Sequence, residues 1–270
     1  MVKLVALSRL TLAAAFLSAV ALPAPAAVLY DGSNTLQPLP ADQGWAYGTN
    51  PLIGPSVIQT SVPGGVRLDS TPVMGEMAGY FSLEPIFHSF SHPGMQPLDR
   101  AAGYIVTFDV KINSEGHASS DRAGFSIIAI SSDLMGIELG FWEDRIFAQE
   151  AGFTHAEEAV FSTAAMTRYE LSVAGASYAL RAGGSPTPIL MGSLRDYSPA
   201  SVPVPDVYEI PSFLFLGDDT SSAAASVDIE YIELVPEPAA LSLLALGGLA
   251  LLRRRCGYGG QALLRRRKRN

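Results

Sequence analysis

Residues 124–149 read GFSIIAISSDLMGIELGFWEDRIFAQ, and this stretch decides the fold class. Gly124–Ile130 is a nearly continuous apolar run of strand length, which is typical of a strand buried on both faces. Gly136–Trp142 then alternates apolar with small or acidic residues, and Arg145–Gln149 follows after a two-residue acidic turn. Two such runs joined by a short polar turn predict a β-hairpin.

Further strand-like runs flank this stretch on both sides. Tyr104–Ile112 precedes it and is rich in β-branched and aromatic residues. Later runs of the same kind are Thr167–Val173, Ser177–Arg181, Phe213–Leu216 and Ala225–Leu234. Short strands at this spacing predict an all-β sandwich. Thr154–Ala165 is the one segment that could form a short helix, and Val28–Gly65 is rich in Gly, Pro and Asn.

The charges are distributed unevenly along the chain. Between Val28 and Val235 there are 8 basic and 25 acidic residues, which gives this body a formal net charge of −17. Nucleic acid is excluded as a partner, because phosphate contacts need lysine and arginine. Solubility explains the charge, and calcium or a cationic partner is the alternative. The single cysteine, Cys256, lies outside the body, which therefore has no disulfide or thiolate site.

The N-terminus has the three regions of a secretory signal peptide. Lys3 and Arg9 make a positive start, and Leu10–Val20 is a short apolar run. Small residues follow, which predicts cleavage after Ala26 or Ala27. The chain is therefore expected to be exported.

The C-terminal region contains three ordered features. Pro236-Glu237-Pro238 is followed by the apolar run Ala239–Leu252 and by Arg253-Arg254-Arg255. The two prolines predict an extended, accessible segment instead of regular helix or strand. As a helix, Pro236–Leu252 would extend ~26 Å at ~1.5 Å per residue, slightly short of a ~30 Å hydrocarbon core. The arginines would mark the cytoplasmic side of such a span.

This order of parts resembles the PEP-CTERM sorting signal of exported bacterial proteins. The resemblance covers Val235–Arg255 and implies recognition of Pro236, Glu237 and Pro238 by a membrane-embedded exosortase-type processing enzyme, with transient anchoring in the inner membrane. The signal of that family usually ends just after the arginines, whereas this chain continues through a basic tail, residues 256–270. A plain single-span anchor is the alternative.

The body resembles LamG-like, concanavalin-type sandwiches of exported bacterial proteins. The similar pieces are Ser119–Ser126, the Gly136–Gln149 hairpin, and Phe215–Ser222 followed by the final strand. Proteins of the PEP-CTERM "choice-anchor" kind often carry such a body. The resemblance implies a jelly-roll fold, and a fold alone does not give a function.

Acidic residues near the hairpin are candidates for a glycosidase pair. Glu138, Glu143 and Asp144 lie close together, and glycoside hydrolysis needs two carboxyl groups. Sandwich glycosidases place their acids two and four or five residues apart along one strand, but Gly140 occupies the second position. Solvated hairpin charges are therefore the prediction, with no catalytic residue.

A second acidic group, Asp218-Asp219 followed by Thr220, could ligate calcium, because this ion prefers carboxylate and hydroxyl oxygens. A turn between two strands is the favoured explanation. Asp121 with Arg122 is expected to form a structural ion pair at the entry to a strand. No other cofactor is expected.

Histidines and aromatic residues are the remaining candidates for binding groups. His88 and His92 share a Gly/Pro-rich loop with no third ligand, so no zinc site is expected. Trp45, Phe141 and Trp142 could stack on sugar rings, although packing in the core is the default for each. Trp142 together with the neighbouring Glu143 is the candidate ligand-binding pair on this hairpin.

These observations predict four segments. They are a signal peptide (1–27), a β-sandwich (28–235), a sorting signal with a hydrophobic span (236–255) and the basic tail (256–270). The predicted function is that of a non-enzymatic exported protein of the cell envelope or extracellular polysaccharide matrix, with a structural or glycan-adhesive body. A polysaccharide-active enzyme on a concanavalin-like fold is the alternative.

Overall fold

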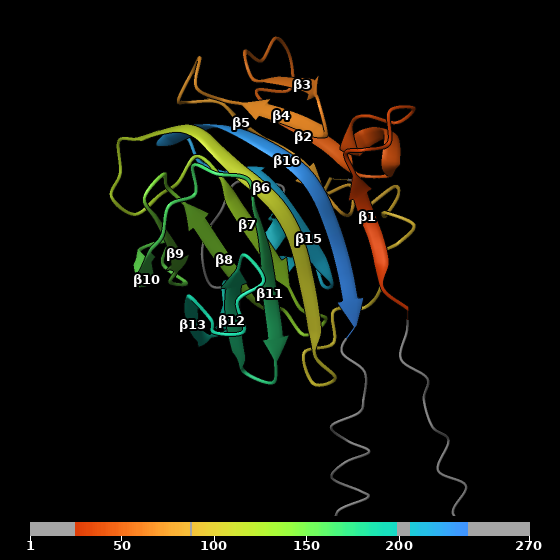
Figure 1. Cartoon of the computed structure of the whole chain (residues 1–270), viewed down its shortest axis with the longest axis vertical. Helices are drawn as coiled ribbons and strands as arrows, with labels where there is room; N and C mark the ends of the chain where they lie inside the picture. The colour runs from red at the N-terminus through yellow and green to blue at the C-terminus, as the bar shows by residue number, and fades with distance from the viewer. Residues whose placement is uncertain (1–24, 87, 199–205, 237–270) are drawn as a thin grey trace, which may run out of the picture.

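Two antiparallel eight-stranded sheets, here named sheet A and sheet B, form a sandwich (Figure 1). The computed structural model describes residues 25–86, 88–198 and 206–236. The prediction of an all-β sandwich is confirmed. The signal peptide up to residue 24, the hydrophobic span Ala239–Leu252 and the arginine cluster lie outside the described residues. No helix in the described ranges is long and apolar enough to cross a membrane.

Sheet A consists of seven strands in one continuous order and an eighth strand, β1, which also pairs with β16. In order, its strands are β13 (Leu190–Ser193), β12 (Ser177–Ala182), β11 (Thr167–Ala174), β6 (Tyr104–His117), β16 (Ala223–Pro236), β4 (Gly65–Asp69) and β3 (Ile58–Val62), with β1 (Ala27–Asp31) beside β16.

Sheet B contains the predicted hairpin near one of its edges, and β14 pairs additionally with β8. In order, its strands are β10 (His155–Val160), β9 (Arg145–Gln149), β8 (Met135–Phe141), β7 (Ser126–Ile130), β15 (Phe213–Asp218), β5 (Met77–Phe81) and β2 (Ala46–Asn50), with β14 (Arg195–Asp196) beside β8. Two short 3-10 helices complete the described elements, η1 (Pro40–Gln43) and η2 (Val207–Glu209).

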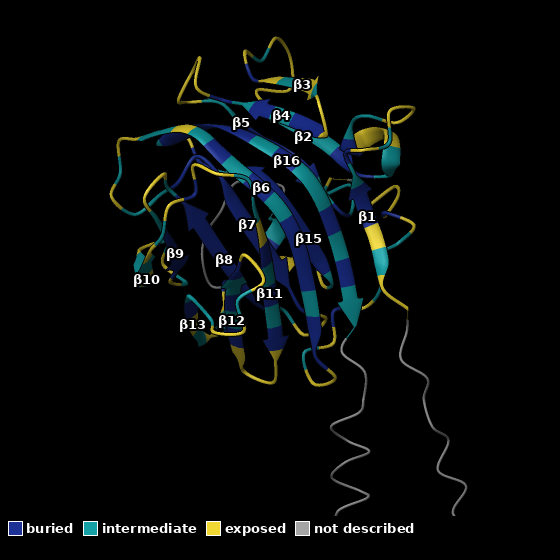
Figure 2. Ribbon diagram, viewed as in Figure 1, coloured by how far each residue is buried: buried dark blue, intermediate teal, exposed yellow. Residues whose placement is uncertain are grey.

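The core between the sheets follows from the two-residue period of the strands. On β6, Val106, Phe108 and Val110 are fully buried and face the other sheet, as alternation requires. All five residues of β7 are buried (Figure 2), because Ile127 points into this core and Ile128 into a second apolar cluster on the far face. The prediction that this strand is buried on both faces is confirmed.

Two local predictions are wrong. Thr154–Ala165 contains strand β10 in place of a helix, because pairing with β9 outweighs a weak helical preference. Pro236 ends β16 opposite Tyr104, although a break in regular structure was predicted at this residue. A proline lacks the amide hydrogen, and the end of a strand tolerates that loss.

The last two strands are inserted into the middle of the sheets. β15 lies between β7 and β5 in sheet B, and β16 lies between β6 and β4 in sheet A. β16 also pairs with β1, Ala27 lying opposite Leu234, so both ends of the described body lie side by side at the same end of the sandwich (Figure 1).

Candidate ligand-binding site

The candidate site lies on the face of sheet B that is turned away from sheet A. Along β15, Leu214 and Leu216 belong to the core between the sheets, whereas Phe213 and Phe215 belong to the second cluster on the opposite face. Tyr208 of η2 is part of the same cluster, so a segment outside the sheets covers part of this face. The uncovered part forms the floor of the site.

A row of small residues crosses this face. Five neighbouring strands place Gly48, Gly79, Gly217, Ser126 and Gly140 directly opposite one another. A glycine in a strand interior often marks a place where another group approaches the backbone closely. The row therefore leaves room on the sheet surface for large side chains from the adjoining strands.

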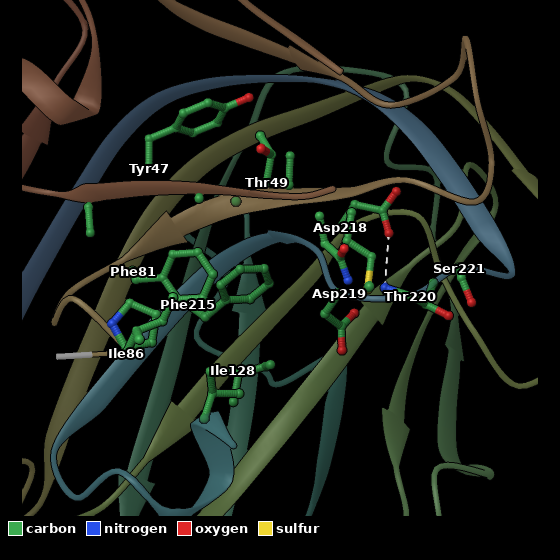
Figure 3. A pocket seen from close by; sticks show the side chains of 18 of the residues that line it. Tyr47, Thr49, Phe81, Ile86, Ile128, Phe215, Asp218, Asp219, Thr220 and Ser221 are labelled. Atoms are coloured by element: carbon green, nitrogen blue, oxygen red, sulfur yellow. Dashed lines mark hydrogen bonds between the residues drawn. The ribbon is translucent and has the colours of Figure 1, made fainter. Parts of the chain in front are cut away.

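Phenylalanine rings fill that room. A Cβ atom added at Gly48 would lie 2.9 Å from the ring of Phe81, and one added at Gly79 would overlap the ring of Phe215. The centroids of the two rings are 4.9 Å apart, at an interplanar angle of 57°. Both rings line the cavity described below, so they form an apolar, aromatic floor (Figure 3).

Replacing Gly79 by alanine is expected to destabilise the protein by about 2–3 kcal/mol, because the new methyl group would meet both the Phe215 ring and the carbonyl oxygen of Leu216. Gly75→Ala is the control, since nothing lies within 4 Å of a Cβ there, and it should change the stability by less than about 0.5 kcal/mol. Chemical denaturation measures both. Equal stability of the two variants would contradict the close packing of the floor.

A cavity of about 700 Å³ stands on this floor. Its apolar walls include Ile128 of β7, Phe153 of the turn between β9 and β10, and Leu52 and Ile86 from two loops. Leu52 is 74% exposed and Ile86 is 46% exposed, which places apolar side chains at the mouth of the cavity. A cavity of this size and lining suits a small organic ligand or a few units of a polymer.

The other end of the cavity is polar. The turn from β15 to β16 contributes Asp219, Thr220, Ser221 and Ser222 to the lining, and Arg122 joins them from the loop before β7. Figure 3 shows this end opposite the phenylalanine floor. The cavity thus offers a stacking surface at one end and hydrogen-bonding groups at the other.

Arg122 binds two carboxylates. Its Nη2 lies 2.7 Å from Oδ2 of Asp219 and its Nη1 lies 3.4 Å from Oε1 of Glu138. Glu138 is fully buried on β8, and the hydroxyl of Tyr208 donates to its Oε2 at 2.5 Å. Oδ1 of Asp219 and Oε1 of Glu138 are buried without a hydrogen-bond partner. Buried carboxylate oxygens without donors are costly, so retention of a proton within this cluster is favoured.

Burial sets the protonation of this cluster. Removal from water, and secondarily the charge of Asp219, raises the pKa of Glu138 to about 8. Burial likewise raises the pKa of Asp218 to about 8, although the hydroxyl of Ser70 and the amide of Thr220 oppose the shift. Glu138 and Asp218 therefore hold protons near neutral pH.

Neighbouring side chains hold the cluster in place. The indole of Trp142 donates to the carbonyl oxygen of Arg122 at 2.9 Å, which fixes the backbone that carries the guanidinium. Asp206 caps η2 by accepting from the amide of Tyr208. The hydroxyl of Tyr197 accepts from the amide of Glu138 and donates to the carbonyl oxygen of Gln149.

Two predictions about charged residues need correction. Arg122 was expected to pair with Asp121, but Asp121 accepts from the amide of His155 instead, and Arg122 turns toward Asp219. Glu138 was expected to be a solvated hairpin charge and is fully buried, because η2 and Tyr208 cover its face of β8. The expectation of exposed charges is correct for Glu143 and Asp144.

Asp218 and Asp219 do not act as a pair. Their carboxylates point to opposite sides of the chain (Figure 3). Asp218 points toward Ser70, which follows β4 of sheet A, and Asp219 points toward Arg122. Oδ1 of Asp218 accepts from the amide of Thr220, so the predicted turn is confirmed. Among the described residues, no group of three or more His, Cys, Asp or Glu side chains is placed to hold a metal ion.

The predicted ligand pair Trp142 and Glu143 lies outside the cavity. The Trp142 ring stacks on His117, with centroids 3.8 Å apart and planes 4° from parallel, and Arg145 lies 5.4 Å from its centroid. Oε1 of Glu143 accepts from the amide of Glu115. Ligand binding by this pair stays a prediction, while Trp142 has the structural role described above.

Core packing is confirmed for two other aromatic candidates, and one of the two loop histidines is buried as well. Trp45 and Phe141 are buried in the core between the sheets. His92 is 4% exposed, and its ring is held by the carbonyl oxygen of Leu29 and the amide of Gly94. His88 is exposed.

Sequence reasoning missed Tyr208, Phe81 and Phe215 as parts of a site. Tyr208 comes from a segment with no strand pattern, so nothing in the sequence placed it over β8. A usable signal was the acidic Glu138 within an otherwise apolar strand, since a charged residue there needs a partner.

No protein-family model matches the chain, and no curated protein matches it. Among solved structures, a carbohydrate esterase of the Shiga toxin-encoding bacteriophage phi24B aligns with a TM-score of 0.49 and 13% identity, covering 78% of this chain and 98% of its own. A Bacillus subtilis protein of unknown function with a galectin-like fold gives 0.45 and 10%, with coverage of 78% and 96%. The lumenal domain of VIP36, in a Ca2+- and mannose-bound form, gives 0.39 and 10%, with coverage of 71% and 82%. The assignment of a sandwich rests on the strand pairing of this chain itself.

Proposed function

We propose that this protein is an exported, non-enzymatic glycan-binding module and that the cavity on sheet B is its binding site. The observation that carries the proposal is the combination of an aromatic floor, Phe81 and Phe215, with a polar end built by Arg122, Asp219 and Ser221. Saccharides have one apolar face and a rim of hydroxyl groups, so they need such a pair of surfaces. The LamG-like resemblance of the sequence agrees with this proposal.

Ser221→Trp is expected to weaken glycan binding about tenfold or more, because the exposed Ser221 lines the cavity and an indole there would fill it. Ser177→Trp is the matched control, since Ser177 is equally exposed but belongs to sheet A. A glycan array, followed by titration of the best ligand, measures both. Undiminished binding by Ser221→Trp would exclude the cavity as the site, and a blank array would remove the glycan function.

An enzyme on the same fold is the second candidate, favoured by one observation. Glu138 has a pKa raised to about 8 and lies beside the Asp219–Arg122 pair, as a general acid often does. Its side chain is fully buried and does not line the cavity, however, so a role in positioning Arg122 and Tyr208 fits it better. Release of reducing sugar from a bound glycan, lost in Glu138→Gln, would establish the enzyme instead.

The proposal includes sorting to the cell envelope or extracellular matrix, with exosortase-type processing of the C-terminal signal. It is supported by the sequence resemblance over Val235–Arg255. Mass spectrometry of the protein from its native host is expected to find a start at Ala27 or Val28 and an end near Pro236–Pro238. A mature chain that retains Arg253–Asn270 in the inner membrane would mean a plain anchor.

A further inference from the structure

The cavity is apolar well beyond its floor. Phe81 and Phe215 form the floor, and Ile128 and Phe153 also line the cavity. Ile86, which Figure 3 shows grouped with the two floor rings, is 46% exposed at the mouth. These side chains carry no hydrogen-bonding group, so a ligand hydroxyl turned toward them loses its water without gaining a partner. A saccharide with free hydroxyl groups on its whole rim therefore fits this lining only in part.

The charged groups at the polar end are paired with one another. The acidic and basic side chains that line the described part of the cavity are Glu84, Arg122, Asp218 and Asp219. The guanidinium of Arg122 lies 2.7 Å from the carboxylate of Asp219 and 3.4 Å from that of Glu138. Because this cation and its anion already compensate each other, a charged ligand would meet no unshared counter-ion in the pair.

The other two carboxyl groups of the lining are held by the protein itself. Oδ2 of Asp218 accepts from the hydroxyl of Ser70 at 2.5 Å, and burial raises the pKa of this carboxyl to about 8, so it is neutral near pH 7. The two oxygens of Glu84 accept within its own loop, from the amide of Ile86 at 2.8 Å and from the hydroxyl of Ser89 at 3.2 Å. Together with the paired guanidinium, these bonds favour an uncharged ligand.

We propose that the cavity selects an uncharged saccharide whose hydroxyl groups are partly esterified with acetyl groups. The acetyl methyl groups pack against the apolar lining, and the free hydroxyls lie at the turn between β15 and β16, where Ser221 is exposed. This inference rests on the proposed glycan-binding function and narrows it to O-acetylated polymers. An acetyl ester removes a hydroxyl donor and adds a methyl group, so it avoids an unpaired donor and also buries more apolar surface.

Matched pairs of β-1,4-linked tetrasaccharides test the inference. Tetramers of glucose, xylose and mannose are each partly acetylated, and a portion of each sample is then deacetylated in mild alkali, so that the two members of a pair differ only in the ester groups. Calorimetric titration of the purified full chain at pH 6.5 is expected to give about tenfold tighter binding for the acetylated member of at least one pair. Ser221→Trp, which fills the cavity, should weaken this binding about tenfold or more.

The double variant Leu52→Ser with Ile86→Ser tests the apolar lining itself. Both side chains line the cavity and are exposed at its mouth, 74% and 46%, so the fold should tolerate the change. The preference for the acetylated tetramer is expected to fall from about tenfold to about threefold or less. Leu36→Ser with Val160→Ser is the matched control and should keep the preference, because these side chains are 91% and 84% exposed and do not line the cavity. Unfolding curves of each variant confirm that the fold is retained.

The outcomes separate the two proposals. A preference for the acetylated tetramer that is reduced in the double variant and blocked in Ser221→Trp supports the inference. Equal binding of the two members of every pair would overturn it while leaving the glycan function intact. Binding that survives Ser221→Trp would overturn both the inference and the cavity as the glycan site. Decanoic acid that binds more tightly than every tetramer, and is blocked in Ser221→Trp, would assign the cavity to a lipid and overturn both proposals.

Discussion

Arg122→Met is expected to lower the free energy of unfolding by about 3–5 kcal/mol at pH 8. The guanidinium is 13% exposed and lies against Asp219 and the fully buried Glu138. Removing it leaves two carboxyl groups in a water-poor environment with no compensating charge. The loss should be smaller at pH 6, where Glu138, with a pKa of about 8, holds its proton. Urea denaturation at the two pH values measures both effects.

Arg168→Met provides the control for this experiment. Arg168 also pairs with a carboxylate, since its Nη2 lies 2.7 Å from Oδ2 of Asp109, but its side chain is 53% exposed. An exposed ion pair contributes only about 0–1 kcal/mol. If Arg122→Met were no more destabilising than Arg168→Met, the cluster at the polar end of the cavity would not be a buried ion-pair network.

Stability should fall as the pH rises from 6.5 to 9, by about 2–4 kcal/mol. Glu138 and Asp218 have pKa values of about 8 in the folded protein, against ordinary values of 4.5 and 3.8. Over this range the unfolded chain has already released both protons, whereas the folded protein releases them only on passing about pH 8. The folded state thus binds more protons, and stability decreases with pH. His92 and His155, whose pKa values burial lowers from 6.5, have the opposite effect only near the lower limit of this range, where the unfolded chain still binds protons on them.

Glu138→Gln isolates the contribution of one of the two groups. Glutamine is uncharged like protonated Glu138 and can still accept from the hydroxyl of Tyr208. The dependence of stability on pH should therefore become about half as steep in this variant, with little loss at pH 6.5. Thermal unfolding midpoints across the pH range measure it. An unchanged slope would show that Glu138 is ionised in the folded protein at neutral pH.

The sequence predicted the strands whose apolar pattern is dense, and missed those whose pattern is sparse. Residues 124–149 gave β7, β8 and β9 because β-branched residues and a short acidic turn coincide there. β2 and β5 contain Gly48 and Gly79, so their propensity for strand is low. These two strands form because β5 pairs with β15 and β2 pairs with β5, and this pairing supplies what their own residues do not.

The site was also predictable only in part, because its residues come from segments that are distant in the sequence. Arg122 and Asp219 were recognised as candidates, but their pairing joins segments 97 residues apart. The face of β8 that carries Glu138 is covered by Tyr208, and no pattern along the chain encodes such cover. The alternation of side chains along a strand predicts which face of the sheet a residue occupies. Whether that face is exposed to solvent depends on the segments that cover it.

The central positions of β15 and β16 have a consequence for the order of events during synthesis. A chain emerges N-terminus first, so β5 and β7 must wait for residues 213–218, and β1, β4 and β6 must wait for residues 223–236, before either sheet is continuous. Nearly the whole body must therefore emerge before the native pairing is complete, and such long-range pairing is slow. Until then the nascent chain exposes unpaired strand edges, which makes protection from aggregation a requirement for its maturation.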